Sequence, residues 1–257
     1  MSFISENYFN SSNVSAFSTS RTSGYSKGIY GAFNISPYTC DEPQNIARNK
    51  AALVEILQIS PENLIFPYQT HDDKVLLIDN DFLLLPSNNK TALLHGIDAL
   101  ICNVKHICIG VNTADCVPIL LFDTQNNVSA AIHAGWRGVV KNIVSKTIAK
   151  MTSEFGTKPQ ELHAAIGPCI SGKVYEVGAE LLTEFENAGF DNSQIFLENP
   201  LRVDLVRATE IQLTNAGLAN ANIYKSNICT YTQSEHYFSA RKLGIKSGRC
   251  FSGIVMR

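Results

Sequence analysis

The chain has 257 residues, of which 45% are hydrophobic and 17% charged, a composition that excludes an intrinsically disordered protein. Lys and Arg together number 21 and Asp and Glu 23, which gives a formal net charge of −2. This balance leaves no excess of positive charge for nucleic acid or an anionic membrane, so we expect neither as a partner.

The N-terminus and the cysteines indicate the compartment of the protein. Residues 1–26 lack a basic stretch followed by an apolar one, so we expect no secretory signal. The longest apolar run, residues 117–122, is far shorter than the roughly 18 residues of a membrane-spanning helix. The seven cysteines are scattered and odd in number, so at least one is unpaired within a monomer. We predict a cytoplasmic protein with free thiols, and a monomer because no assembly pattern is visible.

The first predicted elements are a polar segment and a helix. Residues 1–15 are rich in Ser and Asn, and we expect them to be loose. Asp41 and Pro43 predict a helix start, with the aspartate as cap and the proline in the first turn. Apolar residues at helical spacing extend this helix to about Gln58.

The middle of the chain predicts short strands that are rich in Val, Ile and Leu and separated by Asn, Asp and Gly. These strands cover residues 64–68, 75–78, 99–102, 107–111, 117–122 and 128–133. Apolar residues at helical spacing then predict one helix from Val139 to Met151.

The last part of the chain mixes both element types. It predicts strands over residues 164–166 and 251–255, and helices over residues 178–188 and 204–216. The connections between strands and helices are too irregular for a repeating parallel α/β fold. We therefore predict an α+β fold, in which one domain over residues 1–257 has mixed β-sheets and flanking helices.

Three segments place reactive polar side chains at the ends of predicted strands, and they contain His71, Cys116 and His133. Two imidazoles and one thiolate form a sensible zinc set, because they leave a fourth tetrahedral position for water. Zinc lowers the pKa of such a water toward ~7. The three residues are far apart in sequence, however, and an isolated buried His or Cys is usually structural. Spacing alone therefore favours the structural interpretation.

Other polar residues allow two interpretations each. Asp115 beside Cys116 fits a ligand-orienting group or proton acceptor, and equally an Asx turn or a cap. Arg137 lies at a helix start, where backbone N–H groups bind phosphate, but a solvated arginine fits as well. Cys169 is a nucleophile only if a base lowers its pKa, and a small buried residue in a tight turn is the favoured interpretation.

Three arginines are further candidates for anion contacts. Arg241 and Arg249 suit phosphate or carboxylate groups, although a structural salt bridge fits Arg249 at least as well. Arg21 lies in a polar loop over residues 19–26, which either closes over a substrate or is an ordinary surface loop.

Several short motifs, spread in order over residues 17–254, resemble one protein family. They are Gln69-Thr70-His71, Thr113-Ala114-Asp115-Cys116-Val117-Pro118, His133-Ala134-Gly135-Trp136-Arg137-Gly138, Gly167-Pro168-Cys169-Ile170, Tyr175-Glu176-Val177, Cys229-Thr230, Phe238-Ser239-Ala240-Arg241 and Gly248-Arg249. On these residues the chain resembles the YfiH/YlmD family, whose members are described both as polyphenol oxidases or laccase-domain proteins and as purine nucleoside phosphorylases.

The resemblance implies a mixed α+β fold that is also seen in a bacterial toxin with a Cys–His hydrolase site. It implies zinc ligands at His71, Cys116 and His133. It also implies phosphorolysis of adenosine, inosine, guanosine and methylthioadenosine, together with deamination of adenosine. The substrates would then be purine nucleosides and phosphate.

The residues that we expect to serve these reactions follow from the same motifs. Asp115 is the proposed proton shuttle. Arg21, Arg137 or Arg241, together with backbone N–H groups, holds the phosphate that attacks C1′ of the ribose. Residues 21–26 and Asn34 also resemble the family's N-terminal loop. The expected substrate contacts are therefore Arg21, Ser23, Asn34, Gln69 and Cys169.

A count of histidines tests the laccase description. A multicopper oxidase with a trinuclear centre needs about ten histidines, many in His-x-His pairs. This chain has six histidines and no such pair, so it does not build that centre. A single copper at the zinc set is expected to give at most weak polyphenol oxidase activity, because copper outcompetes zinc at such ligands.

Two other classes of function stay open. The first is a Cys–His hydrolase or amidase that uses Cys116 or Cys169, or a related enzyme that edits cell-wall precursors. The second is a structural zinc or partner-binding protein, for which Cys169 or His236 would have to supply a fourth metal ligand.

Overall fold

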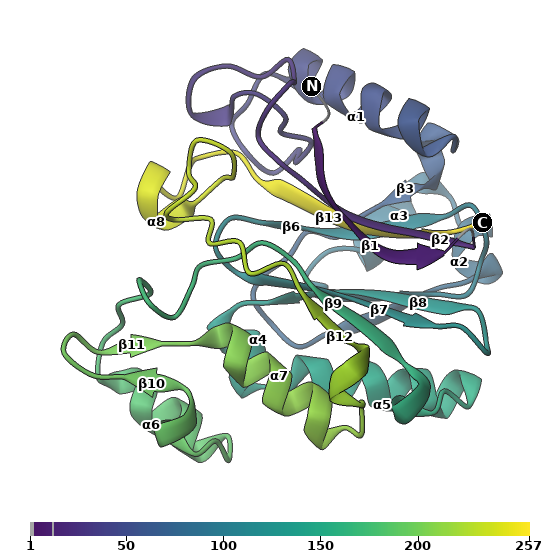
Figure 1. Ribbon diagram of the computed structural model, residues 1–257. Coiled ribbons are helices and arrows are strands. Elements are labelled where there is room, and N and C mark those ends of the chain that lie inside the picture. Colours follow the sequence, from purple (N-terminus) through teal and green to yellow (C-terminus); the bar gives the residue numbers. More distant parts are fainter. Residues whose placement is uncertain (1–2, 12) are drawn as a thin grey trace.

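Two β-sheets lie face to face, and helices cover the outer face of each sheet (Figure 1). This computed structural model describes residues 3–11 and 13–257. The layers therefore run helix, sheet, sheet, helix, with one apolar core in each of the three spaces between them.

The first sheet has five strands in the order β1-β2-β13-β6-β3, and only β3 pairs in parallel. Its strands are β1 Ile4–Ser11, β2 Val14–Thr19, β13 Cys250–Met256, β6 Cys108–Thr113 and β3 Leu64–Ile65. Helix α1, Pro43–Leu57, covers its outer face, where Leu53 and Leu57 join a buried cluster with Phe17 and Phe251.

The second sheet has six strands in the order β12-β9-β7-β8-β5-β4, with parallel pairs only at its two edges. Its strands are β12 Ile223–Lys225, β9 His163–Ile166, β7 Val117–Asp123, β8 Val128–Ala134, β5 Ala99–Cys102 and β4 Val75–Ile78. Its outer face is covered by α4 Trp136–Val140, α5 Ile143–Phe155 and α7 Leu205–Asn215.

Strands β7 and β8 show why the middle of the chain is so apolar. Side chains alternate between the faces of a strand. In β7, Ile119 packs toward the helices and Leu120 toward the other sheet, and every residue of both strands is buried. Strands with two buried faces read as continuous apolar runs.

Shorter elements connect these layers. They are helices α2 Asn80–Leu84, α3 Ser87–Leu93, α6 Glu180–Asn187 and α8 Ala240–Leu243, strands β10 Phe196–Leu197 and β11 Arg202–Val203, and 3-10 turns η1 Gly28–Tyr30, η2 Pro61–Asn63, η3 Pro159–Glu161, η4 Asn192–Gln194 and η5 Asn220–Asn222. Among the described residues, no helix has the length and apolarity needed to cross a membrane.

The predicted α+β fold with mixed sheets and flanking helices is confirmed. Two local expectations differ from the structure. The segment expected to be loose contains β1, which gains its order by pairing with β2 rather than from its own Ser- and Asn-rich sequence. The single helix expected from Val139 to Met151 is two helices, because Asn142 adopts a left-handed conformation with φ of 61° and ends the first one.

Candidate metal centre

Neighbouring strands β5, β7 and β8 of the six-stranded sheet begin or end side by side, and the residues of the candidate metal centre gather at these strand ends. Cys116 directly precedes β7, whose first residue pairs with the last residue of β8. His133 lies one position earlier in β8, and its backbone N–H donates to the carbonyl of Asp98, just before β5. His71 comes from the loop between β3 and β4.

His71, Cys116 and His133 form one cluster whose possible ligand atoms all lie within 4.8 Å of one another. The two imidazole rings are 4.7 Å apart and nearly perpendicular. Gly135 leaves the necessary room, because a Cβ there would lie 3.0 Å from the His71 ring and 3.1 Å from the Cys116 sulfur. The structure therefore brings together the three residues that the sequence proposed as a set.

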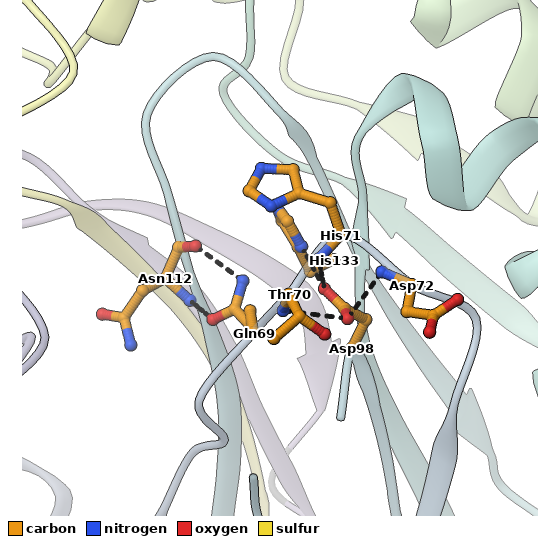
Figure 2. Close-up of polar contacts among 7 residues, drawn as sticks. All are labelled: Gln69, Thr70, His71, Asp72, Asp98, Asn112 and His133. Carbon is orange, nitrogen blue, oxygen red and sulfur yellow. Dashed lines mark hydrogen bonds and ion pairs between the residues drawn. The ribbon is translucent and has the colours of Figure 1, made fainter. Parts of the chain in front are cut away.

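Asp98 organises two of these residues, and the sequence analysis did not find it. Its carboxylate accepts hydrogen bonds from the backbone N–H groups of Thr70, His71 and Asp72 at 3.1, 3.0 and 2.8 Å (Figure 2). It also lies 2.7 Å from Nδ1 of His133, with both side chains buried. A carboxylate accepts only, so Nδ1 donates and Nε2 remains free to bind a metal.

The conformation of the loop around His71 and the negative charge of Asp98 depend on each other. His71 has a φ of 62°, which non-glycine residues rarely adopt, and the three N–H groups that surround the carboxylate hold it there. Burial alone would raise the pKa of Asp98, but the contacts with His133 and the backbone N–H groups outweigh it and lower the pKa below its usual value. The carboxyl therefore stays ionised. The only sequence signal was an aspartate directly in front of an apolar strand.

The cluster favours a thiolate in the metal-free protein. Burial raises the pKa of the Cys116 thiol, but the charge of His133 and hydrogen bonds from His133 and His71 lower it to about 6. Burial disfavours the charged ring of His133, whereas Cys116 and Asp98 raise its pKa to about 9. Thiolate is the form of cysteine that binds metals and acts as a nucleophile.

We predict that Cys116 of chelator-treated protein reacts with iodoacetamide half-maximally near pH 6, because the thiolate forms above that pKa. Peptide mapping by mass spectrometry at several pH values measures this. Adding zinc should protect Cys116 at neutral pH, while the exposed Cys40 stays equally reactive and serves as the control. Equal labelling of Cys116 with and without zinc would argue against a metal site.

A cavity of about 180 Å³ lies beside the cluster. It is lined by residues from four segments, 36–39, 68–71, 112–116 and 240–249, and by His133. Gln69, one of the expected substrate contacts, lines it, and its side-chain amide bonds the backbone N–H and carbonyl of Asn112 at 2.8 and 2.9 Å. Arg249, which the sequence offered as a candidate for an anion contact, also lines it, as does Asn112.

Arg137 and Arg241 face a second, more open hollow of about 440 Å³, together with Trp136, Tyr175 and Glu176. The Arg137 guanidinium lies 4.3 Å from the Trp136 ring centroid, and that of Arg241 lies 5.1 Å from the Tyr175 ring centroid. The structure thus brings two of the three expected phosphate contacts to one place, and Arg21 is not among them.

Asp115 is buried, and both of its carboxylate oxygens are engaged. One accepts a hydrogen bond from the hydroxyl of Thr230 and the other from the backbone N–H of Arg241, each at 2.7 Å. Its backbone carbonyl accepts from the N–H of Ile170. These contacts fix the start of α8, and with it the position of Arg241.

The remaining expected substrate contacts do not line the 180 Å³ cavity. Arg21 donates to the carbonyls of Gly31 and Ser234 at 2.7 Å each, so its guanidinium joins two loops. Asn34 is fully buried, with its amide bonded to neighbouring loop residues. Ser23 is exposed on the surface.

Cys169 lies outside both the cavity and the ligand cluster. The backbone of Cys169 lies beside that of Cys229 in a single parallel β contact, and both thiols are free. Burial raises the pKa of the Cys169 thiol well above the ordinary value. His236 is exposed and also lies outside the cluster. Among the described residues, the cluster therefore offers three possible protein ligands. A tetrahedral zinc ion held by them would keep one position for water or substrate, as catalytic rather than structural zinc sites do.

The chain is similar to known proteins over nearly its whole length. The chain is 42% identical over 249 residues to "Purine nucleoside phosphorylase" of Bacteroides thetaiotaomicron, covering 95% of this chain and 92% of the relative. It is 38% identical over 248 residues to "Adenosine deaminase RL5" of an unknown prokaryotic organism, covering 95% and 94%.

Solved structures share the fold. YlmD from Geobacillus stearothermophilus superposes with a TM-score of 0.88 at 24% identity, covering 96% of this chain and 93% of that one. YfiH from Bacillus licheniformis gives a TM-score of 0.87 at 24% identity, covering 95% and 93%. These neighbours and relatives confirm the resemblance to the YfiH/YlmD proteins. A model of the multi-copper polyphenol oxidoreductase laccase family matches residues 15–257, so the chain belongs to that family.

Proposed function

We propose that the protein is a zinc-dependent purine nucleoside enzyme that cleaves adenosine, inosine, guanosine and methylthioadenosine with phosphate and deaminates adenosine. The open His-Cys-His cluster beside a small cavity carries the proposal. It is supported by relatives whose names refer to phosphorolysis and deamination of purine nucleosides.

The chemistry of the three ligand side chains suits zinc. Two imidazoles and a thiolate are common zinc ligands, and Asp98 holds His133 with Nε2 free for the ion. When bound, zinc supplies a Lewis acid and lowers the pKa of a water molecule toward ~7. The same donors also accept copper, which binds them more tightly.

The chain's own residues then bind and orient the substrates. Arg137 and Arg241 provide two positive charges in one hollow, where they would hold phosphate for attack at C1′. Because both oxygens of Asp115 already accept hydrogen bonds, we assign it to positioning Arg241 rather than to the proton transfer that its sequence position suggested.

A second candidate function rests on the same atoms. Cys116, His133 and Asp98 stand in the order of nucleophile, base and orienting carboxylate, as a Cys–His hydrolase or amidase requires. The two functions differ in their dependence on metal. Hydrolase turnover would survive complete removal of zinc and would stop on alkylation.

The direct experiment incubates purified protein of known zinc content with adenosine, with and without phosphate. We expect adenine and ribose 1-phosphate only when phosphate is present, and inosine without it. Chelator-treated protein, checked for folding by circular dichroism, should be inactive and should recover with added zinc. The proposal fails if fully metallated protein forms no product from adenosine, inosine or guanosine.

A further inference from the structure

A groove of about 610 Å³ lies beside the edge strand of the five-stranded sheet. It is lined by one face of α1, at positions 47, 50, 51 and 54, and by one face of α3, at positions 87, 90, 91 and 94. Residues 64–66, which include the edge strand β3, line it as well, and Figure 1 shows β3 next to both helices. The groove is separate from the metal cavity and shares only Tyr38 with that cavity's lining.

The lining of this groove is mostly apolar. Its aliphatic and aromatic surface comes largely from Val54, Leu64, Phe66, Phe82 and Leu94. Pockets that enclose small ligands measure roughly 300–1,000 Å³, and the groove falls within this range. It therefore has room for the whole apolar body of a small molecule.

Lys50 brings a positive charge into the apolar lining. Its Nζ lies 4.8 Å from the centroid of the Phe66 ring, and burial lowers the pKa of this ammonium group. Within the described part of the chain, no carboxylate forms an ion pair with it. The aromatic ring offsets only part of the cost of removing an ammonium group from water. Lys50 thus lacks the anionic partner that a desolvated cation requires.

The other charges along the groove add to this imbalance. Lys90 on α3 also lines the groove and has no ion pair among residues 3–11 and 13–257. Glu62 is the one acidic lining residue, and it is exposed and pairs with neither lysine. Two ammonium groups against one carboxylate leave a net positive charge, which favours an anionic ligand.

We propose that the groove binds a small carboxylate with an apolar body, and that the carboxylate pairs with the ammonium group of Lys50. The apolar lining removes the body from water, and the carboxylate supplies the missing counter-charge through a charge-assisted hydrogen bond. A doubly charged phosphate fits less well, because it would bring a second charge into an apolar surrounding. The site lies outside the metal centre and does not depend on the proposed nucleoside function.

Calorimetric titration of the zinc-loaded full chain with decanoate and with 2-naphthoate tests the proposal. One body is a flexible chain and the other a flat ring system, so the tighter of the two identifies the shape that the groove accepts. We expect at least one acid to bind, and to bind about tenfold or more tightly than its alcohol, 1-decanol or 2-naphthalenemethanol, because only the acid pairs with the ammonium group.

Lys50→Met keeps the length of the side chain and removes its charge. The affinity for the acid should fall by about tenfold or more, while the affinity for the matching alcohol stays within about twofold. Lys242→Met is the matched control, because Lys242 also lies over an aromatic ring, 5.0 Å from the Tyr231 centroid, but outside the groove. It should change neither affinity.

Ala51→Phe tests the apolar part of the site separately. Ala51 is an exposed position on the groove face of α1, so a phenyl ring there occupies the groove without entering the core. It should weaken binding of acid and alcohol alike by about tenfold or more. This variant also serves if Lys50→Met does not fold, as judged by thermal unfolding.

Three results would overturn the inference. The first is wild-type protein that binds neither acid, and the second is an acid that binds no more tightly than its alcohol. The third is an acid affinity that stays unchanged in Lys50→Met or in Ala51→Phe, which would place the bound acid elsewhere, for example on the metal.

Discussion

Replacing Cys116 with alanine should remove bound zinc and lower kcat/KM for adenosine by about 1000-fold or more. Cys116 supplies the only thiolate of the three-ligand cluster, and two imidazoles alone bind zinc weakly. A catalytic metal contributes several kcal/mol to transition-state stabilisation, and each tenfold in rate corresponds to about 1.4 kcal/mol. Elemental analysis of the purified variant and steady-state kinetics measure the two effects.

Cys40→Ala is the matched control, because Cys40 is exposed and belongs to no ligand cluster. It should keep full zinc content and activity. A Cys116→Ala protein that keeps both would rule out the site. A variant that keeps its zinc but loses activity would instead support a nucleophilic role for the sulfur, as in the Cys–His hydrolase.

The central strands of the second sheet were predictable because a strand that is buried on both faces is a continuous apolar run in the sequence. Strands β7 and β8 are fully buried and appear as apolar runs with sharp polar ends. Cys116 and His133 stand at those ends and were therefore candidate ligands, but only the family resemblance, not their spacing, favoured a metal set over structural residues. The helix break at Asn142 was not predictable, because the apolar spacing continues through it.

Long-range polar contacts account for what the sequence did not reveal. The backbone groups that Asp98 holds lie 26 to 28 residues before it, and no local pattern links them. Arg21 has the chemistry of a phosphate ligand, yet the fold places the carbonyls of Gly31 and Ser234 against it. Such residues acquire their roles only from the packing of distant loops.

Replacing Asp98 with asparagine should weaken zinc binding by about 10- to 100-fold, the effect typical of losing a group that orients a metal ligand. The shape is kept, but an amide nitrogen facing Nδ1 of His133 donates rather than accepts. It therefore favours the tautomer with its proton on Nε2, the atom that must bind the metal. The variant also loses acceptors for the N–H groups around His71, at a cost of about 1–3 kcal/mol.

Zinc affinity by competition with a chromophoric chelator, together with thermal unfolding of metal-free protein, separates these two effects. Asp123→Asn is the matched control, because Asp123 is also a buried aspartate that accepts backbone N–H groups, at the opposite end of β7. It should lower stability while zinc affinity stays within about twofold, since no metal ligand touches it. If both variants lose stability and neither loses affinity, Asp98 only supports the loop. A loss of affinity confined to Asp98→Asn shows that its hydrogen bond to His133 prepares the metal site.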